Sequence, residues 1–323
     1  MNHLRQNRPL PIMALLALLP LTVAAHANGA WSEFPAGGVV FKKDPEISIL
    51  REDLEIGLDE IRVRYVFSSF SREPLERTIG FPMAKVPLDD SPDNFEDRSR
   101  ARDGEDARNY MGFKVSVDGK PIAATLHEYA WSGEDNVTAR LADLGVPVFA
   151  PDIEAFEKLA RLPEATIRAL AQEDLATQDG SWVIPKWQYQ SVYEWTQSFE
   201  AGHTIVEVSY KPLFGSDYGP EPYFESGSKS ADYCYDNATR QMLAGLSGFP
   251  EPFTVGYVLK TAANWNGPIG RFNLRINNEE GGFARFCVPE GLKAVGDGAS
   301  WFAEEFVPSS DLAIVFFLPH DRP

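Results

Sequence analysis

Residues 187–199 read WQYQSVYEWTQSF, and their side chains alternate between two characters. The odd-numbered residues are mainly aromatic, and the even-numbered residues are mainly polar. Successive side chains of a β-strand point to opposite faces, so this period of two predicts a long strand with one buried face. After a turn at 201–202, the alternation from Thr204 to Tyr210 predicts an antiparallel partner strand.

The same period continues on both sides of this hairpin. Apolar residues recur at every second position from 46 to 81, which predicts an antiparallel meander with turns at 57–60 and 71–74. The pair Asp118-Gly119 predicts a hairpin between 113 and 126. Further strands are predicted at 254–261, 271–276, 283–288, 300–306 and 312–318.

Helical spacing interrupts the strands between 136 and 174. Apolar residues there fall at three- and four-residue steps, and prolines punctuate the segment. This pattern predicts three short helices, near 137–144, 153–160 and 164–171. Another helix is predicted near 236–244. Loops are predicted at 88–109, which is highly charged, and at 215–230, which is rich in Gly, Pro and Ser.

Together these elements predict a mainly β protein. The strands lack the regular crossover helices of a parallel sheet, which favours two antiparallel β-sandwich-like modules with a short three-helix insertion. The expected division is a signal peptide at 1–27, an N-terminal β domain at 28–133, a helical insertion at 134–180 and a C-terminal β-sandwich domain at 181–323.

The first residues have the composition of a cleavable export signal. Arg5 and Arg8 precede an apolar run at 12–25 that is too short to span a bilayer, and Ala25-His26-Ala27 is a small-x-small cleavage pattern. The mature chain is therefore expected to begin near Asn28, in an oxidising compartment. Later apolar stretches are shorter than a membrane helix, so a soluble protein without a membrane span is expected.

The net charge limits which partners are expected, and the cysteine content limits which compartment is expected. The chain carries a net charge of −17, and loss of the leader removes two arginines and no acid. This charge repels nucleic acid and anionic lipid headgroups, so polyanions are predicted to be poor partners. Cys234 and Cys287 are predicted to form a disulfide. The alternative, a thiol nucleophile, needs a nearby base that the local sequence does not supply.

The sequence carries no recognisable catalytic or metal-binding pattern. Beyond the leader, histidines occur only at 127, 203 and 320, without the short-spaced pairs of metal sites. A Gly-x-Ser-x-Gly elbow, a phosphate-binding loop and a dinucleotide fingerprint are also missing, so no catalytic residue, metal or cofactor is predicted. The chain contains 47 acidic residues, so the sequence neither supports nor rules out a pair of carboxylates of the kind that glycosidases use.

The aromatic face of 187–199 is the candidate ligand surface. If it is exposed, it is a stacking platform for sugar rings or a peptide, and if it is buried, it is the inner face of a sheet. The turn at 264–269 either packs through its tryptophan or presents it at a rim where a partner docks. The candidate ligand-binding residues are therefore Trp187, Tyr189, Tyr193, Trp195, Gln197 and Trp265.

Several motifs resemble those of a known family. They are Tyr193-x-Trp195-x-Gln197-x-Phe199, Tyr210-x-Pro212-x-x-Gly215, Tyr233-Cys234, Thr261-x-x-Asn264-Trp265-x-Gly267-Pro268-Ile269-x-x-Phe272 and Phe286-Cys287. In these motifs the chain resembles the exported bacterial proteins of the domain-of-unknown-function family DUF4424. The resemblance implies a periplasmic, mainly β protein of Gram-negative bacteria, and it transfers no catalytic residue. It supports the disulfide, because both cysteines lie in matching motifs. Val208 departs from the family pattern, in which a histidine is expected.

The leading hypothesis is an exported, periplasmic, non-enzymatic β-sandwich protein of unknown specific role, which binds or scaffolds an envelope component, either a protein or a carbohydrate. One alternative is a carbohydrate-active or other hydrolase with acidic residues in a cleft between the two modules. A second alternative is a small-molecule binding protein with an enclosed apolar pocket.

Overall fold

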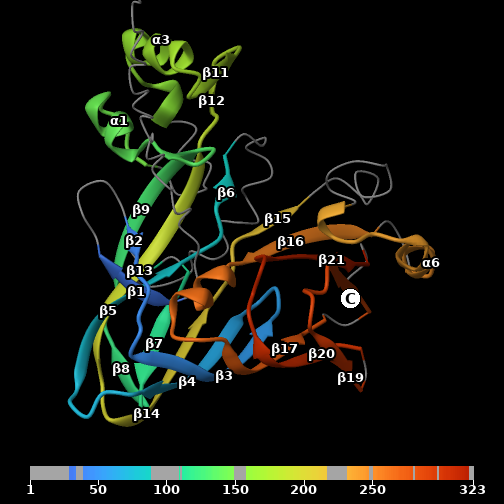
Figure 1. Ribbon diagram of the computed structural model, residues 1–323. Helices are drawn as coiled ribbons and strands as arrows, with labels where there is room; N and C mark the ends of the chain where they lie inside the picture. The colour runs from blue at the N-terminus through green and yellow to red at the C-terminus, as the bar shows by residue number, and fades with distance from the viewer. Residues whose placement is uncertain are drawn as a thin grey trace, which may run out of the picture.

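The computed structural model describes residues 29–33, 39–88, 109, 111–148, 158–216, 231–246, 250–278, 281–296 and 298–319. These residues form three large β-sheets and one separate hairpin, which confirms the mainly β fold class (Figure 1). The predicted signal peptide and most of the two predicted loops lie outside the described residues.

An eight-stranded sheet lies across the lower part of Figure 1. Its strands, in spatial order, are β19 (Lys293–Val295), β20 (Ser300–Phe306), β17 (Ile269–Ile276), β3 (Ile47–Ile56), β4 (Ile61–Ser69), β14 (Gly202–Tyr210), β7 (Lys114–Val117) and β8 (Lys120–Ile122). Neighbouring strands of this sheet are antiparallel apart from β17 and β3, which run parallel. The predicted Asp118-Gly119 hairpin joins β7 to β8, and both turn residues have positive φ, as the tight hairpin turn requires.

A seven-stranded sheet covers one half of the eight-stranded sheet. Its strands are β10 (Asp135–Asn136), β9 (Thr125–Ser132), β13 (Gln188–Phe199), β5 (Leu75–Pro82), β1 (Ala30–Glu33) and β2 (Val40–Phe41), with β6 (Val86–Pro87) also paired to β13. The long strand predicted at 187–199 is β13, which pairs with β9 along its first half and with β5 along its second.

A four-stranded sheet lies over the other half. Its strands are β15 (Phe214–Ser216), β16 (Glu251–Tyr257), β21 (Leu312–Leu318) and β18 (Phe283–Phe286). Across the interface, the Phe286 ring packs edge-on against Trp301 of β20 with centroids 4.8 Å apart. The Tyr257 and Tyr65 hydroxyl groups lie 3.1 Å apart, which joins β16 to β4. The molecule is therefore two sandwiches that share one continuous sheet and one main apolar core.

The strands of the two predicted β domains interleave. After the insertion, the hairpin of β13 and β14 adds one strand to each of the two largest sheets: β13 lies between β9 and β5, and β14 lies between β7 and β4. In addition, β17 pairs with β3. The segments 28–133 and 181–323 thus share both sheets, because hydrogen-bonded pairing across the predicted boundary holds them together.

Helices occupy the predicted insertion and the molecular periphery. The predicted insertion holds α1 (Thr138–Asp143), α3 (Glu164–Gln172) and β11 (Ala176–Asp179). Strand β12 (Trp182–Pro185) lies just beyond its predicted end at 180 and pairs with β11, and these elements project together at the top of Figure 1. Of the middle predicted helix, residues 158–160 are helical, and the part at 153–157 lies outside the described residues. The predicted helix near 236–244 is α6 (Asn237–Ala244). The segment predicted as a strand at 254–261 ends earlier, at Tyr257, and continues into the 3₁₀ helix η3 (Lys260–Asn264).

Candidate functional site

The outer face of the eight-stranded sheet, turned away from the other two sheets, carries a hollow of about 1120 Å³. We call it the groove. Five strands contribute its charged side chains, namely β17, β3, β4, β14 and β7, and β20 and β19 add Trp301, Phe302 and Val295 at one end. Among the described residues its charged lining consists of Arg51, Arg62, Arg64, Lys114, Arg271 and Arg275, with Asp53, Glu55 and Glu207 as the acids.

Strand alternation delivers these side chains to one face. In β4 the odd-numbered residues Ile61 and Val63 are buried in the core, so Arg62 and Arg64 point outward. In β17 the buried residues Phe272 and Leu274 alternate with outward-facing residues in the same way. The sequence therefore gives β4 and β17 each a polar outer face that contains arginines. Pairing of the strands in the sheet joins these outer faces into one surface.

A β-bulge sets the outward residues of β3. The pairing of β3 with β4 shifts register between Ile49 and Arg51, so Leu50 is the extra residue. Before the bulge the buried isoleucines are odd-numbered, and after it the buried residues Leu54 and Ile56 are even-numbered. The shift turns Arg51, Asp53 and Glu55 toward the groove.

Part of the groove is neutralised by internal ion pairs. Asp53 accepts a hydrogen bond from Arg51 Nε at 2.8 Å and another from Asn273 Nδ2 at 2.7 Å. Arg64 lies between two carboxylates, 3.9 Å from Asp53 and 3.6 Å from Glu207. The hydrogen bond and the charge of Asp53 raise the pKa of the Arg51 guanidinium above its ordinary value.

The remaining cations are less fully compensated. Arg62 pairs with Glu60, and Arg271 pairs with Glu304 at 2.9 Å. Within the described part of the chain, no carboxylate lies within ion-pair distance of Lys114 or Arg275. With Glu60 and Glu304 counted, the six cations of the groove face five carboxylates, which leaves a small excess of positive charge on a chain whose net charge is −17.

The residues predicted to bind a ligand are buried between the sheets. Trp187, Tyr189, Tyr193, Trp195, Gln197 and Trp265 are at most 5% exposed. Tyr193 stacks on Phe113 with centroids 4.1 Å apart, and Trp265 packs on Phe67 at 4.8 Å. The void beside Trp195 and Trp265 measures about 10 Å³, no more than the space of one water molecule. In this structure these rings fill the space between sheets and present no stacking platform.

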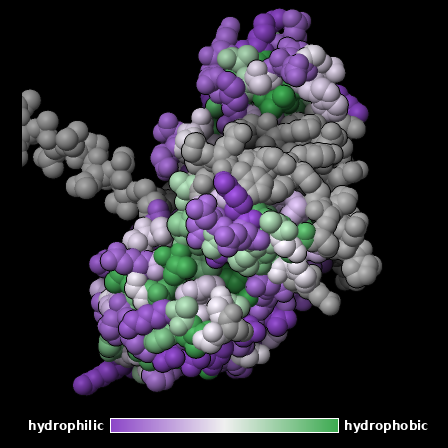
Figure 2. Space-filling model, turned by 90° about the vertical axis from the view of Figure 1, so that its right-hand side faces the viewer, coloured by the Kyte–Doolittle hydropathy of each residue, from purple (hydrophilic) through white to green (hydrophobic). Residues whose placement is uncertain are grey.

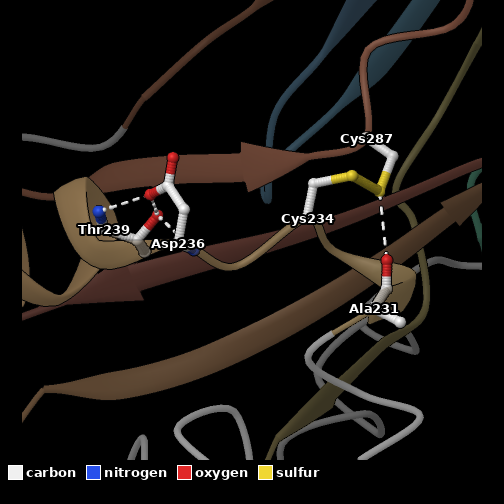
Figure 3. The surroundings of a disulfide bond; sticks show 5 residues. All are labelled: Ala231, Cys234, Asp236, Thr239 and Cys287. Atoms are coloured by element: carbon white, nitrogen blue, oxygen red, sulfur yellow. Dashed lines mark hydrogen bonds between the residues drawn. A yellow bond between two sulfur atoms is a disulfide. The ribbon is translucent and has the colours of Figure 1, made fainter. Parts of the chain in front are cut away.

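The two cysteines form the predicted disulfide (Figure 3). It joins the segment before α6 to the segment after β18 across 53 residues of sequence. The helix beside it begins with a capping box, in which Asp236 accepts a hydrogen bond from the Thr239 amide at 2.8 Å. These hydrogen bonds lower the pKa of the Asp236 carboxyl.

Other chemistry is sparse in the described part of the chain. Its residues contain no cluster of three or more potential metal ligands, and none of its helices is long and apolar enough to cross a bilayer. His127 Nε2 lies 2.6 Å from Glu194, whereas His203 is exposed on β14 and His320 is outside the described residues. In the view of Figure 2, hydrophobic residues show between larger hydrophilic areas. Exposed large apolar side chains are scattered over separate elements, such as Phe70, Trp182 and Val295.

The sequence reasoning missed the groove residues. The available signal was the arginines that alternate with buried residues in β4 and β17, at 62, 64, 271 and 275. This signal shows that each strand has a polar face. It does not show which strands are neighbours, and a groove requires neighbouring strands.

Comparison with known proteins places the chain in a family without assigned activity. No curated protein matches it. Among solved structures it is similar to a candidate nutrient-binding protein from Legionella pneumophila, with 16% identity, a TM-score of 0.39, and coverage of 91% of this chain and 71% of that chain. The family described as Domain of unknown function (DUF4424) matches residues 27–315, so the chain belongs to this family.

Proposed function

We propose that this protein is an exported, non-enzymatic binding protein of the cell envelope and that the groove is its ligand surface. The observation that carries the proposal is the groove itself. It is a large hollow lined by polar and charged side chains from five strands, and these side chains do not serve the core. Ligand sites in proteins are concave and carry a small number of placed polar groups.

Export to the periplasm is part of the proposal. The leader-like residues 1–27 support it, and the family match begins at residue 27, where that leader is expected to end. The disulfide between Cys234 and Cys287 also supports an oxidising compartment. Recovery of the protein in an osmotic-shock fraction, with Asn28 as its first residue by mass spectrometry, is the expected result, and a cytosolic product that retains residues 1–27 would contradict it.

The groove is better suited to binding than to glycoside hydrolysis. Asp53 and Glu55 lie roughly 7 Å apart on one face of β3, and Asp53 and Glu207 lie two strands apart, a separation of roughly 10 Å. A glycosidase keeps one carboxylic acid protonated by an apolar or like-charged environment. Asp53 and Glu207 face the Arg64 guanidinium instead. Glu55 lies opposite Arg62 on one side and Arg275 on the other.

A blocking substitution tests the binding surface. Ser209 lies on β14 at the groove, and Ser198 lies on β13 and faces solvent on the other large sheet. Ser209→Trp fills the groove floor with a bulky ring, and Ser198→Trp is the matched control. Binding of the processed protein is measured by calorimetry against dextran, peptidoglycan fragments, hyaluronan oligosaccharides and poly-L-glutamate.

The expected result is that Ser209→Trp abolishes binding of at least one of these probes and that Ser198→Trp leaves it intact. Near-ultraviolet circular dichroism confirms that both variants are folded. If none of the probes binds, or if every probe that binds is unaffected by Ser209→Trp, the groove is not the ligand surface.

A further inference from the structure

We infer that the ligand of the groove is a linear acidic polysaccharide whose carboxylates repeat at disaccharide spacing. This inference rests on the proposed function and deepens it. Two observations carry it. Strand pairing places the cations across the groove in a fixed order, and two of these cations have no ion-pair partner among the described residues.

One row of side chains crosses five strands at right angles to their direction. The registers of the four strand pairs place its members opposite one another in the order Arg275, Glu55, Arg62, Ser209 and Lys114. The cations therefore occupy every second strand. Since neighbouring strands lie about 4.8 Å apart, successive cations are separated by roughly 10 Å, and the row spans roughly 20 Å.

The adjacent row is already neutralised. It reads Asn273, Asp53, Arg64, Glu207 and Ser116 across the same strands, and its arginine contacts both acids. Of the two rows, only the first offers cations that the described carboxylates leave unpaired, at Arg275 and Lys114. Its third cation, Arg62, pairs with Glu60 at the end of the hairpin and keeps a side chain that is 65% exposed.

This arrangement matches an extended sugar chain better than other polyanions. A disaccharide repeat is comparable in length to the spacing between successive cations, and the hydroxyl groups of sugars match Ser209, Ser116 and Asn273, which border the cations. Duplex nucleic acid carries a charge about every 1.7 Å, far denser than this row. A protein partner needs large apolar anchors in desolvated pockets, whereas the apolar side chains Val295, Trp301 and Phe302 lie at one end of the groove, on β19 and β20, outside the five strands that carry the two rows.

The acidic surface elsewhere does not prevent such binding. At physiological ionic strength, charges on exposed groups are screened over about 8 Å, so a ligand in the groove responds mainly to the groove's own residues. The expectation that polyanions are poor partners was drawn from the net charge of −17, which averages over the whole chain. Strand pairing concentrates six cationic side chains at one place.

The test compares two triple variants that lose the same charge. The groove variant is Arg62→Gln, Lys114→Gln and Arg275→Gln, and the control variant is Lys43→Gln, Arg72→Gln and Arg168→Gln, at exposed sites that do not line the groove. The probe is hyaluronan oligosaccharides, which carry one carboxylate per disaccharide. The comparison ligands are carboxyl-reduced hyaluronan, poly-L-glutamate and duplex DNA.

We expect the groove variant to bind hyaluronan about tenfold or more weakly than the wild type, because three charge pairs are lost, and the control variant to bind within about twofold. Carboxyl-reduced hyaluronan should not bind, and affinity for hyaluronan should fall as salt rises. Glu55→Gln removes the only acid of the row and should strengthen binding about twofold or more, an effect that partial unfolding does not produce.

Three results would overturn the inference: equal binding by both triple variants, unchanged or weaker binding by Glu55→Gln, or tighter binding of poly-L-glutamate or DNA than of hyaluronan. If a neutral or peptide probe binds and Ser209→Trp abolishes that binding while hyaluronan does not bind, the ligand class is wrong and the proposed function stands. If no probe is sensitive to Ser209→Trp, the proposed function fails as well.

Discussion

The core provides hydrogen-bond acceptors for the buried indole groups of Trp195 and Trp265, whereas Trp187 Nε1 has none among the described residues. Trp265 Nε1 donates to the Gly29 carbonyl at 2.7 Å, and Trp195 Nε1 donates to Gln197 Oε1 at 2.7 Å. The second contact explains why a glutamine occupies the aromatic face of β13. A buried indole N–H without an acceptor would lose the hydrogen bond that it makes to water in the unfolded chain.

A titration prediction concerns Tyr129, which is 8% exposed. Burial, together with the charge of Glu194, raises the pKa of its hydroxyl to about 12. The folded state therefore favours the neutral phenol, and the resulting stabilisation is present below about pH 10 and lost as the pH rises from about 10 to about 12. In urea unfolding on both sides of pH 10, Tyr129→Phe should lose less stability with rising pH than the wild type. An equal loss in both proteins would contradict this.

At the scale of elements, the bulge in β3 both shapes the groove and constrains its neighbour β17. A Cβ atom on Gly270 would lie 2.8 Å from the Leu50 carbonyl oxygen, which is closer than packed atoms approach. The bulged backbone thus requires a glycine on the adjoining strand. The sequence shows that the apolar residues switch from odd to even positions after Ile49, but it does not show the close approach of β17.

Gly270→Ala should therefore destabilise the protein by about 1–3 kcal/mol, because backbone atoms must move to accommodate the methyl group. Gly57→Ala is the comparison, since its nearest neighbours would be 3.4 Å away or more and no backbone strain is expected. Urea denaturation followed by tryptophan fluorescence measures both changes. Similar stability of the two variants would show that β17 and the bulge are not as close as described.

At the scale of the whole molecule, the shared sheets predict one cooperative unfolding transition. The hairpin of β13 and β14 is hydrogen-bonded to strands of the N-terminal segment in both large sheets, so neither half keeps its pairing alone. Unfolding curves from circular dichroism and tryptophan fluorescence should coincide. The fragment 181–323 should not fold when expressed by itself. Two separated transitions, or a folded fragment, would support independent domains instead.

The disulfide acts at the same scale. It closes a loop of 53 residues that includes α6, β16, η3 and β17. In the chain-entropy model, a loop of this length contributes about 4 kcal/mol by restricting the unfolded chain. The bond thereby ties the four-stranded sheet to the segment that precedes α6.

The sequence by itself determined many of the elements, and it also indicated the disulfide and the family. Strands such as β20 and β21, the Asp118-Gly119 hairpin and helix α6 depend on local periodicity, turn chemistry and capping, all of which can be read within a few residues. Prediction of the disulfide required only the rule that an isolated pair of cysteines forms a bond if the protein is in an oxidising compartment.

Only the tertiary structure decided which strands are neighbours. Two features follow from that: the N-terminal and C-terminal segments share sheets, and the groove forms on the outer face of one of them. A period of two shows that Arg62 and Arg275 face away from the core, but nothing local shows that β3 alone separates their strands. The same holds for the aromatic face of β13, which a local pattern leaves either exposed or covered. Strand neighbours are set by hydrogen bonds and packing between residues distant in sequence, and this information lies in the combination of all strands together.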